Sequence, residues 1–218
     1  MLKEKKLFYN TISPLLLNVL KKLMATKAFD QFRLVGGTAL SLHRGHRKSA
    51  DIDLFTDANY GSIDFEAIDN FLHNTYPYVD STNSNIIGMG KSYYVGENKD
   101  DCIKLDIFYT DEFIREIELI DAIRLASIEE IIAMKIDVIL RGGRKKDYWD
   151  IHELMDDYSL HEMLSWHEKR YPYTHDKKLI KNNFTEFANA DKDFEPICLR
   201  GKHWEIIKLD MIDFVNEL

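Results

Sequence analysis

The stretch that most constrains the fold of this chain runs from Phe32 to Asp57, FRLVGGTALSLHRGHRKSADIDLFTD. A short apolar run ending at Val35 leads into Gly36-Gly37, and the residues from Thr38 onward carry helical spacing. This pattern predicts a strand, a glycine turn and the first turn of a helix. Glycines let the backbone come close to an anion, and the free N–H groups of a helix N-terminus point toward it. The turn is therefore a candidate phosphate-binding site.

Two aspartates follow on the next predicted strand. In the segment ADIDLF, apolar residues alternate with Asp51 and Asp53, which indicates a strand that carries both carboxylates on one face. Neighbouring carboxylates repel each other unless a cation lies between them. A Gly-Gly turn or an Asp-x-Asp pair alone is compatible with an ordinary turn or an exposed strand face. Together with a basic loop they provide what magnesium-dependent phosphoryl transfer requires.

Positive charge is concentrated in two segments, residues 44–48 and 141–146. This distribution is expected of a site that handles triphosphates, and the alternative is that each segment is a solvated loop. The whole chain has a formal net charge of −8 and a pI near 5.5. Such a charge argues against a protein that coats nucleic acid non-specifically, because that binding requires many neutralised phosphates.

The sequence GGTALSL followed by HRKSADIDLF is similar to the opening motif of nucleotidyltransferases of the DNA polymerase β superfamily, in the form carried by AbiEii toxins of bacterial type IV toxin–antitoxin systems. The resemblance implies that Gly36, Gly37 and Thr38 bind the phosphates of a nucleoside triphosphate. It implies that Asp51 and Asp53 are catalytic and hold two Mg²⁺ ions, or Mn²⁺. Gly37-Thr38 stands where Gly-Ser is usual, which keeps a hydroxyl in the turn. The basic loop then contributes further nucleotide contacts, from Arg47, Lys48 and Ser49.

A third carboxylate is expected on a later strand. Residues 101–109 alternate so that Lys104 and Asp106 fall on one face and Leu105 and Ile107 on the other. Two-metal phosphoryl transfer needs a third acidic side chain. The resemblance selects Asp106 as this catalytic metal ligand, with Asp101 as the fallback; the alternative is that Asp106 is an ordinary aspartate on an exposed face.

The segment AMKIDVILRGGRKKDYWDIHEL resembles a later motif of the same family, in which a lysine on one helix precedes a short turn and Lys-Asp-x-x-Asp. On that match Lys135 and Lys146 approach the nucleotide, and Asp147 and Asp150 orient bases or backbone nearby. The residues themselves leave alternatives open. Lys135 could be a lysine whose stem lies along an amphipathic helix, and Asp150 a solvent-facing or arginine-paired carboxylate.

The rest of the chain is mostly helical in pattern. We expect helices at 15–24, 63–76, 127–139, 144–154, 160–171, 177–188 and 204–218, and further strands at 84–89 and 92–95 joined by a turn near 88–91. Cys102 and Cys198 are expected to be buried free thiols. The histidines after residue 160 are expected at the surface, and the aromatic residues Trp166, Tyr171, Tyr173, Phe184, Phe187 and Trp204 in the core.

The predicted fold class is α/β, a polymerase β-like nucleotidyltransferase fold with a mixed sheet in residues 1–125, followed by a helical C-terminal part in 126–218. The resemblance implies that the chain moves an NMP from an NTP to a tRNA 3′ end and is restrained by an antitoxin protein. The rival functions are transfer to a small molecule, as in aminoglycoside nucleotidyltransferases, and a nucleotide- or partner-binding module without turnover. With no apolar run long enough for a membrane span and no signal-peptide core, we expect a cytoplasmic protein.

Overall fold

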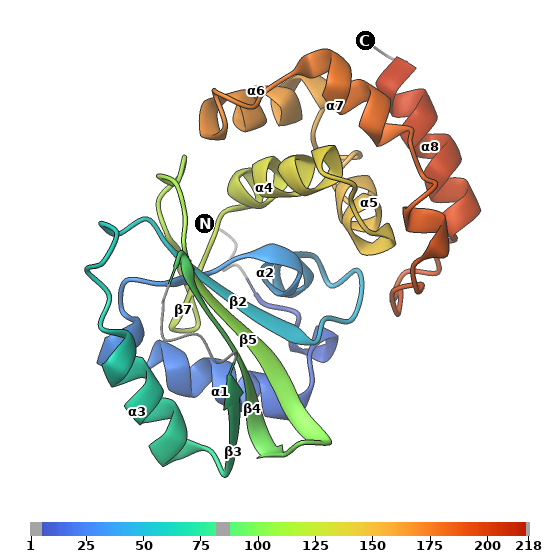
Figure 1. Ribbon diagram of the computed structural model, residues 1–218. Coiled ribbons are helices and arrows are strands. Elements are labelled where there is room, and N and C mark those ends of the chain that lie inside the picture. The colour runs from blue at the N-terminus through green and yellow to red at the C-terminus, as the bar shows by residue number, and fades with distance from the viewer. Residues whose placement is uncertain (1–5, 82–87, 217–218) are drawn as a thin grey trace, which may run out of the picture.

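The computed structural model describes residues 6–81 and 88–216. Its centre is a seven-stranded sheet in the order β3-β4-β5-β2-β1-β7-β6 (Figure 1). The strands are β1 (Arg33–Leu34), β2 (Asp51–Thr56), β3 (Tyr78–Ser81), β4 (Gly90–Asn98), β5 (Asp101–Tyr109), β6 (Glu118–Ile120) and β7 (Ile123–Leu125). The pairs β2–β5 and β1–β7 are parallel and the others antiparallel. The predicted mixed α/β sheet is confirmed.

Helices cover the sheet on both sides (Figure 1). They are α1 (Pro14–Met24), α2 (Gly36–Arg44), α3 (Phe65–Thr75), α4 (Ile128–Leu140), α5 (Lys145–His152), α6 (Leu160–Arg170), α7 (Lys177–Phe184) and α8 (Trp204–Asn216), with 3-10 turns η1 (Tyr9–Thr11), η2 (Lys27–Phe29) and η3 (Ala190–Lys192). Helices α4 to α8 gather beyond α2, whereas α1 and α3 lie on the opposite side. The predicted division at residues 125 and 126 falls between β7 and α4. No helix of the described chain is both long and apolar enough to cross a bilayer.

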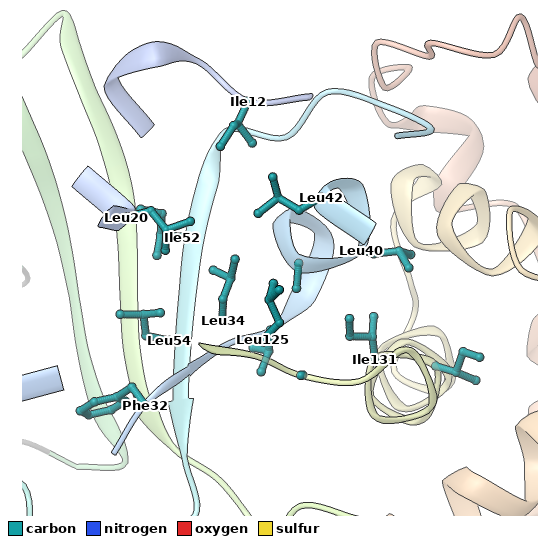
Figure 2. Close-up of a cluster of buried hydrophobic side chains, with 14 of the residues drawn as sticks. Ile12, Leu20, Phe32, Leu34, Leu40, Leu42, Ile52, Leu54, Leu125 and Ile131 are labelled. Atoms are coloured by element: carbon teal, nitrogen blue, oxygen red, sulfur yellow. The ribbon is translucent and has the colours of Figure 1, made fainter. Parts of the chain in front are cut away.

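The alternation of β2 decides what the sheet buries and what it presents. Ile52 and Leu54 are fully buried in the core, where Figure 2 shows them near Leu20 of α1. Asp51 and Asp53 leave the strand on the other face because successive side chains alternate. The core on one face of β2 thus fixes the direction of the carboxylates on the other.

The starts of α1 and α4 follow from their capping residues. Ser13 accepts a hydrogen bond from the backbone N–H of Leu16 at 3.1 Å, with Pro14 in the first turn of α1. Ser127 accepts from the N–H of Glu130 at 3.2 Å and starts α4. Helix α4 then ends at Leu140, just before Gly142, whose φ of +88° is typical of a helix stop.

The expected strand at 92–95 lies within β4, but the bounds of β4 and the shorter strands were not predicted correctly. Most of the expected strand at 84–89 lies outside the described residues, and β4 begins at Gly90, inside the expected turn. Strands β3, β6 and β7 were missed because three or four residues are too few to show an alternation.

Several predictions of burial after residue 160 and at the cysteines were wrong. His167 is fully buried, since it continues the apolar spacing of α6, whereas Tyr173 is fully exposed on the loop after that helix. The other aromatic residues expected in the core are at least partly buried. Cys102 and Cys198 are free thiols but partly exposed, because each lies at a strand or loop edge.

Candidate active site

The pairing of β2 with β5 brings the three predicted carboxylates to one face of the sheet. Asp53 lies opposite Asp106 in the parallel register, and Asp51 lies opposite Lys104. All three aspartates line a cleft of about 710 Å³ between the sheet and α4. A cleft of this size is typical of sites for small molecules and cofactors.

The carboxylates repel one another. Burial, followed by the charges of Asp106 and Asp51, raises the pKa of Asp53 to about 6. Lys135 and Lys146 oppose this shift without cancelling it. The protein's own cations therefore leave the cluster short of positive charge.

Asp106 is only half satisfied. Its Oδ2 accepts a hydrogen bond from the ammonium of Lys104 at 2.5 Å, and its buried Oδ1 has no hydrogen-bond partner among the described residues. Lys104 was not predicted as a site residue, although the alternation of β5 already placed it on the same face as Asp106. In this arrangement Lys104 is the cation closest to the third carboxylate.

The donor set fits a divalent cation by its chemistry. Among the described residues no three acidic, histidine or cysteine side chains are already arranged around one metal position. A divalent cation would nevertheless give the unpaired Oδ1 of Asp106 a partner and oppose the rise in the pKa of Asp53 that burial and repulsion cause. Carboxylate oxygens are the ligands that Mg²⁺ prefers.

The glycine turn lies directly over Asp53. Gly36 starts α2 with a φ of +67°, and a Cβ placed on it would stand 2.5 Å from Asp53 Oδ2. A Cβ on Gly37 would stand 2.4 Å from Arg47 Nη2. Both glycines line the cleft. Each glycine therefore leaves room for a side chain of the protein itself, which is a different reason from the predicted approach to a phosphate.

Thr38 and Ser49 connect the turn to β2. The buried Thr38 hydroxyl contacts the carbonyl oxygen of Asp51 and lies 2.8 Å from Ser49 Oγ. The backbone N–H of Ser49 donates to the carbonyl of Thr11 at 2.9 Å. These contacts fix α2 against the start of the strand that carries the aspartates.

A buried ionic network lies behind the cleft. Asp150 accepts two hydrogen bonds from Arg47, Nε to Oδ1 at 2.6 Å and Nη2 to Oδ2 at 2.7 Å, and Lys135 Nζ lies 2.6 Å from Oδ2. His46 Nε2 is 2.8 Å from Oδ1. Lys135 also donates to Asp147 at 2.6 Å. The network joins α4, α5 and the loop before β2, and it gives Asp150 an arginine partner, one of the alternatives open from the sequence.

The remaining predicted cations differ in availability. Lys146 Nζ lies 3.7 Å from Asp51 Oδ2, and burial, followed by the charge of Arg144, lowers its pKa. The ammonium of Lys48 instead donates to the carbonyl of Asn10. Lys146 is therefore the predicted lysine that faces the carboxylates without a tight ion pair.

The apolar part of the cleft lining was missed from the sequence. It consists of apolar and aromatic side chains from the sheet, α4 and the end of α6, namely Phe55, Tyr109, Ile131, Met134, Val138 and Tyr171. Three of them lie on α4 at helical spacing beside Lys135, which was the available signal. The cleft thus has a charged floor and an apolar wall large enough for an aromatic ring.

Replacing Gly36 with alanine is expected to lower the free energy of unfolding by about 1–2 kcal/mol, because φ of +67° disfavours a side chain. The new methyl group would also displace the Asp53 carboxylate. Calorimetric titration should therefore show Mn²⁺ affinity reduced at least about tenfold, as for other disturbed metal ligands.

Gly61→Ala is the matched control for this change. Gly61 has a φ of +82°, but nothing lies within 4 Å of a Cβ built there. The two variants should lose similar stability, and only Gly36→Ala should lose Mn²⁺ affinity. Equal Mn²⁺ affinity in both variants would remove Asp53 from the metal site.

Comparison with known proteins agrees with this geometry. A protein of Aquifex aeolicus described as uncharacterised is 27% identical over 204 residues, covering 87% of this chain and 88% of that protein. A candidate nucleotidyltransferase from H. pylori has a TM-score of 0.63 at 20% identity, covering 93% of this chain and 90% of that one. MenT4, a nucleotidyltransferase toxin of Mycobacterium tuberculosis, has a TM-score of 0.57 at 14% identity, covering 93% and 84%. These two structures show a shared fold.

The family is given by a sequence match that spans almost the whole chain. The model of the nucleotidyl transferase AbiEii toxin family of type IV toxin–antitoxin systems matches residues 18–217. The match includes the glycine turn, the three aspartates and the buried network. The chain belongs to the AbiEii family of nucleotidyltransferase toxins.

Proposed function

We propose that this nucleotidyltransferase moves an NMP from an NTP to the 3′-hydroxyl of a tRNA, with Mg²⁺ or Mn²⁺ held by Asp51, Asp53 and Asp106. The observation that carries the proposal is the cation-deficient cluster of three carboxylates directly beneath the glycine turn. When bound, the divalent ions supply positive charge that stabilises the phosphate oxygens in the transition state.

The chain's own residues would orient the triphosphate. The backbone of Gly36 and Gly37 offers N–H groups at the start of α2, and Lys146 offers a positive charge beside Asp51. The base would lie against the apolar wall of the cleft, near Met134. Bound in this way, the triphosphate would have its α-phosphorus near the carboxylates.

The transfer itself is an in-line displacement. The acceptor oxygen forms a bond to the α-phosphorus, the bond to the bridging oxygen breaks, and pyrophosphate leaves. Asp106, with an Oδ1 that has no partner among the described residues, is the carboxylate available to take the proton of the acceptor hydroxyl.

The residues of the buried network divide into two groups. Lys135 and Asp147 line the cleft, so we keep them as proposed nucleotide contacts. Arg47 and Asp150 are buried and bound to each other, so we propose that they act by fixing α5 and the glycine turn. Lys48 and Ser49 lie on the adjacent loop, next to Asp51.

The decisive test is incubation with each α-labelled NTP, Mg²⁺ and total tRNA, followed by separation of RNA, protein and small molecules. We expect label from one or more NTPs on tRNA, and none when EDTA replaces Mg²⁺. Label on a small molecule would favour the aminoglycoside-type alternative, and metal-independent NTP binding would overturn the metal assignment. We also propose an antitoxin partner, because type IV systems, to which the family belongs, pair a toxin with one.

Replacing Lys146 with alanine is expected to lower transfer at limiting NTP by roughly 10²-fold, because an electrostatic contact in a partly dry site contributes several kcal/mol. The melting temperature should not fall, since burial disfavours the charged form of Lys146. Steady-state kinetics and thermal melting measure both effects. Lys178→Ala, at an exposed position of α7, is the control and should behave as wild type. Near-normal turnover of Lys146→Ala would show that Lys146 does not contact the nucleotide.

A further inference from the structure

A second, smaller cavity lies beside the nucleotide cleft. It has a volume of about 260 Å³ and is lined by residues 47–51, 193–196 and two cations of the α5 start, Arg144 and Lys146. Asp51, Arg144 and Lys146 line both cavities. The two spaces therefore meet at the outermost catalytic carboxylate, where an acceptor must approach the nucleotide.

The cations of this cavity are only partly used by the protein. The Arg144 side chain is 63% exposed and reaches Asp147 only at 3.9 Å, and that of Lys146 is 31% exposed. Arg47 does not add to this charge, because Asp150 holds it in a bidentate pair. Arg144 therefore remains available to an anionic ligand of this cavity, and Lys146 lies between the cavity and the proposed triphosphate.

An exposed aromatic ring stands at the same place. Phe194 is 93% exposed, which is unusual for a phenylalanine, and it lines the cavity with the cations. Its segment is held to the basic loop by two backbone hydrogen bonds. The backbone N–H of Lys48 donates to the carbonyl oxygen of Ile197, and the backbone N–H of Leu199 donates to that of His46, each at 2.9 Å. The backbone that carries the exposed Phe194 ring is thus held in place by hydrogen bonds.

We propose that this cavity binds the single-stranded 3′ end of the nucleic-acid acceptor. A phosphate would contact Arg144, a terminal base would stack on Phe194, and the 3′-hydroxyl would be presented beside Asp51, while Lys146 remains with the triphosphate. Single-stranded nucleic acids are bound by this combination of positive charge and aromatic stacking. Asp193 and Glu195 line the same cavity and can accept hydrogen bonds from base amino groups or 2′-hydroxyls. The inference rests on the proposed transfer to tRNA and adds where the acceptor lies.

The test is RNA binding by the full chain without NTP. A 5′-fluorescein RNA hairpin with a single-stranded 3′ overhang is titrated by fluorescence anisotropy, and NTP binding is measured separately by calorimetry with Mg²⁺. Phe194→Ala should weaken RNA binding roughly tenfold or more, as for other stacking contacts, with NTP affinity unchanged. Arg144→Gln should weaken it and lower the slope of log K against log salt by about 0.7.

Tyr173→Ala is the matched control. Tyr173 is another strongly exposed aromatic residue beside a cavity, and it lines a space of about 590 Å³ with Lys169 and Glu112 that shares no lining residue with the cavity of Phe194. This variant should bind RNA as wild type does. The proposal is overturned if Phe194→Ala binds RNA normally, or if the loss appears in Tyr173→Ala.

Transfer kinetics separate this inference from the proposed function. If wild type labels tRNA and Phe194→Ala raises the KM for tRNA with kcat retained, the inference is supported. If wild type labels tRNA and Phe194→Ala leaves the KM for tRNA unchanged, the proposed acceptor site is wrong but the proposed function is supported. If wild type binds NTP but not the RNA hairpin, both the site and the tRNA acceptor are wrong.

Discussion

Replacing Asp53 with asparagine is expected to lower nucleotide transfer by orders of magnitude while leaving the metal-free protein at least as stable as wild type. Asparagine keeps the shape of the side chain, but it is a neutral and poorer ligand for Mg²⁺. The same change removes one of three mutually repelling charges, since Asp53 is buried beside Asp106 and Asp51. Activity and stability should thus respond in opposite directions.

The pH dependence of this effect has a defined sign. The pKa of Asp53 is raised to about 6 in the folded protein from its ordinary 3.8, so the folded state binds more protons between these values. Stability therefore falls as pH rises through that window, by on the order of 3 kcal/mol before screening by solvent. In EDTA, ionisation of Asp53 should lower the melting temperature of wild type at pH 8 relative to pH 4. Asp53→Asn should lack this contribution.

Melting curves in EDTA and in excess Mg²⁺ with NTP, combined with the transfer assay, measure both responses. The matched control is Asp101→Asn on the neighbouring strand β5. Asp101 is exposed at the start of β5, and its side chain alternates to the face opposite Asp106. It should change neither activity nor the ligand-induced rise in melting temperature. An Asp53→Asn variant that melts several degrees lower in EDTA yet still transfers nucleotide would contradict the catalytic assignment.

Replacing Asp150 with asparagine should instead destabilise the fold by about 3–5 kcal/mol, because Arg47 and Lys135 would remain buried without their shared anion. For a chain of this length that loss corresponds to a fall in melting temperature of about 10 °C. Burial alone would raise the pKa of Asp150, but the charges of Arg47 and Lys135 hold it well below its usual value. Its stabilisation is therefore present above pH 4 and is lost only as pH falls through this lowered pKa.

Urea unfolding with and without Mg²⁺ and NTP is the measurement. Asp157→Asn serves as the control, since Asp157 pairs with Arg44 at the surface and exposed pairs contribute at most about 1 kcal/mol. The loss in Asp150→Asn should appear equally with EDTA, which a direct nucleotide contact would not produce. A variant with normal stability but a raised KM for NTP would restore Asp150 to the nucleotide site.

Local pattern was sufficient for the elements that hold the three proposed catalytic aspartates. The alternation in residues 50–55 and 101–109 predicted β2 and β5 and the face on which each aspartate lies, because side-chain direction in a strand depends only on parity. Serine caps predicted the starts of α1 and α4 for a similarly local reason. Positive φ at Gly36 is likewise a property of the turn itself.

The partners of these residues depended on tertiary structure. The sequence placed Lys104 and Asp106 on one face, but only the parallel pairing of β2 and β5 set Asp53 opposite Asp106. Asp150 and Arg47 are 103 residues apart in sequence, and nothing in either neighbourhood indicates the pair. The sequence by itself therefore determined which side chains share a strand face or a helix turn. The tertiary structure decided which charges are buried together, because burial and pairing arise only when distant elements pack.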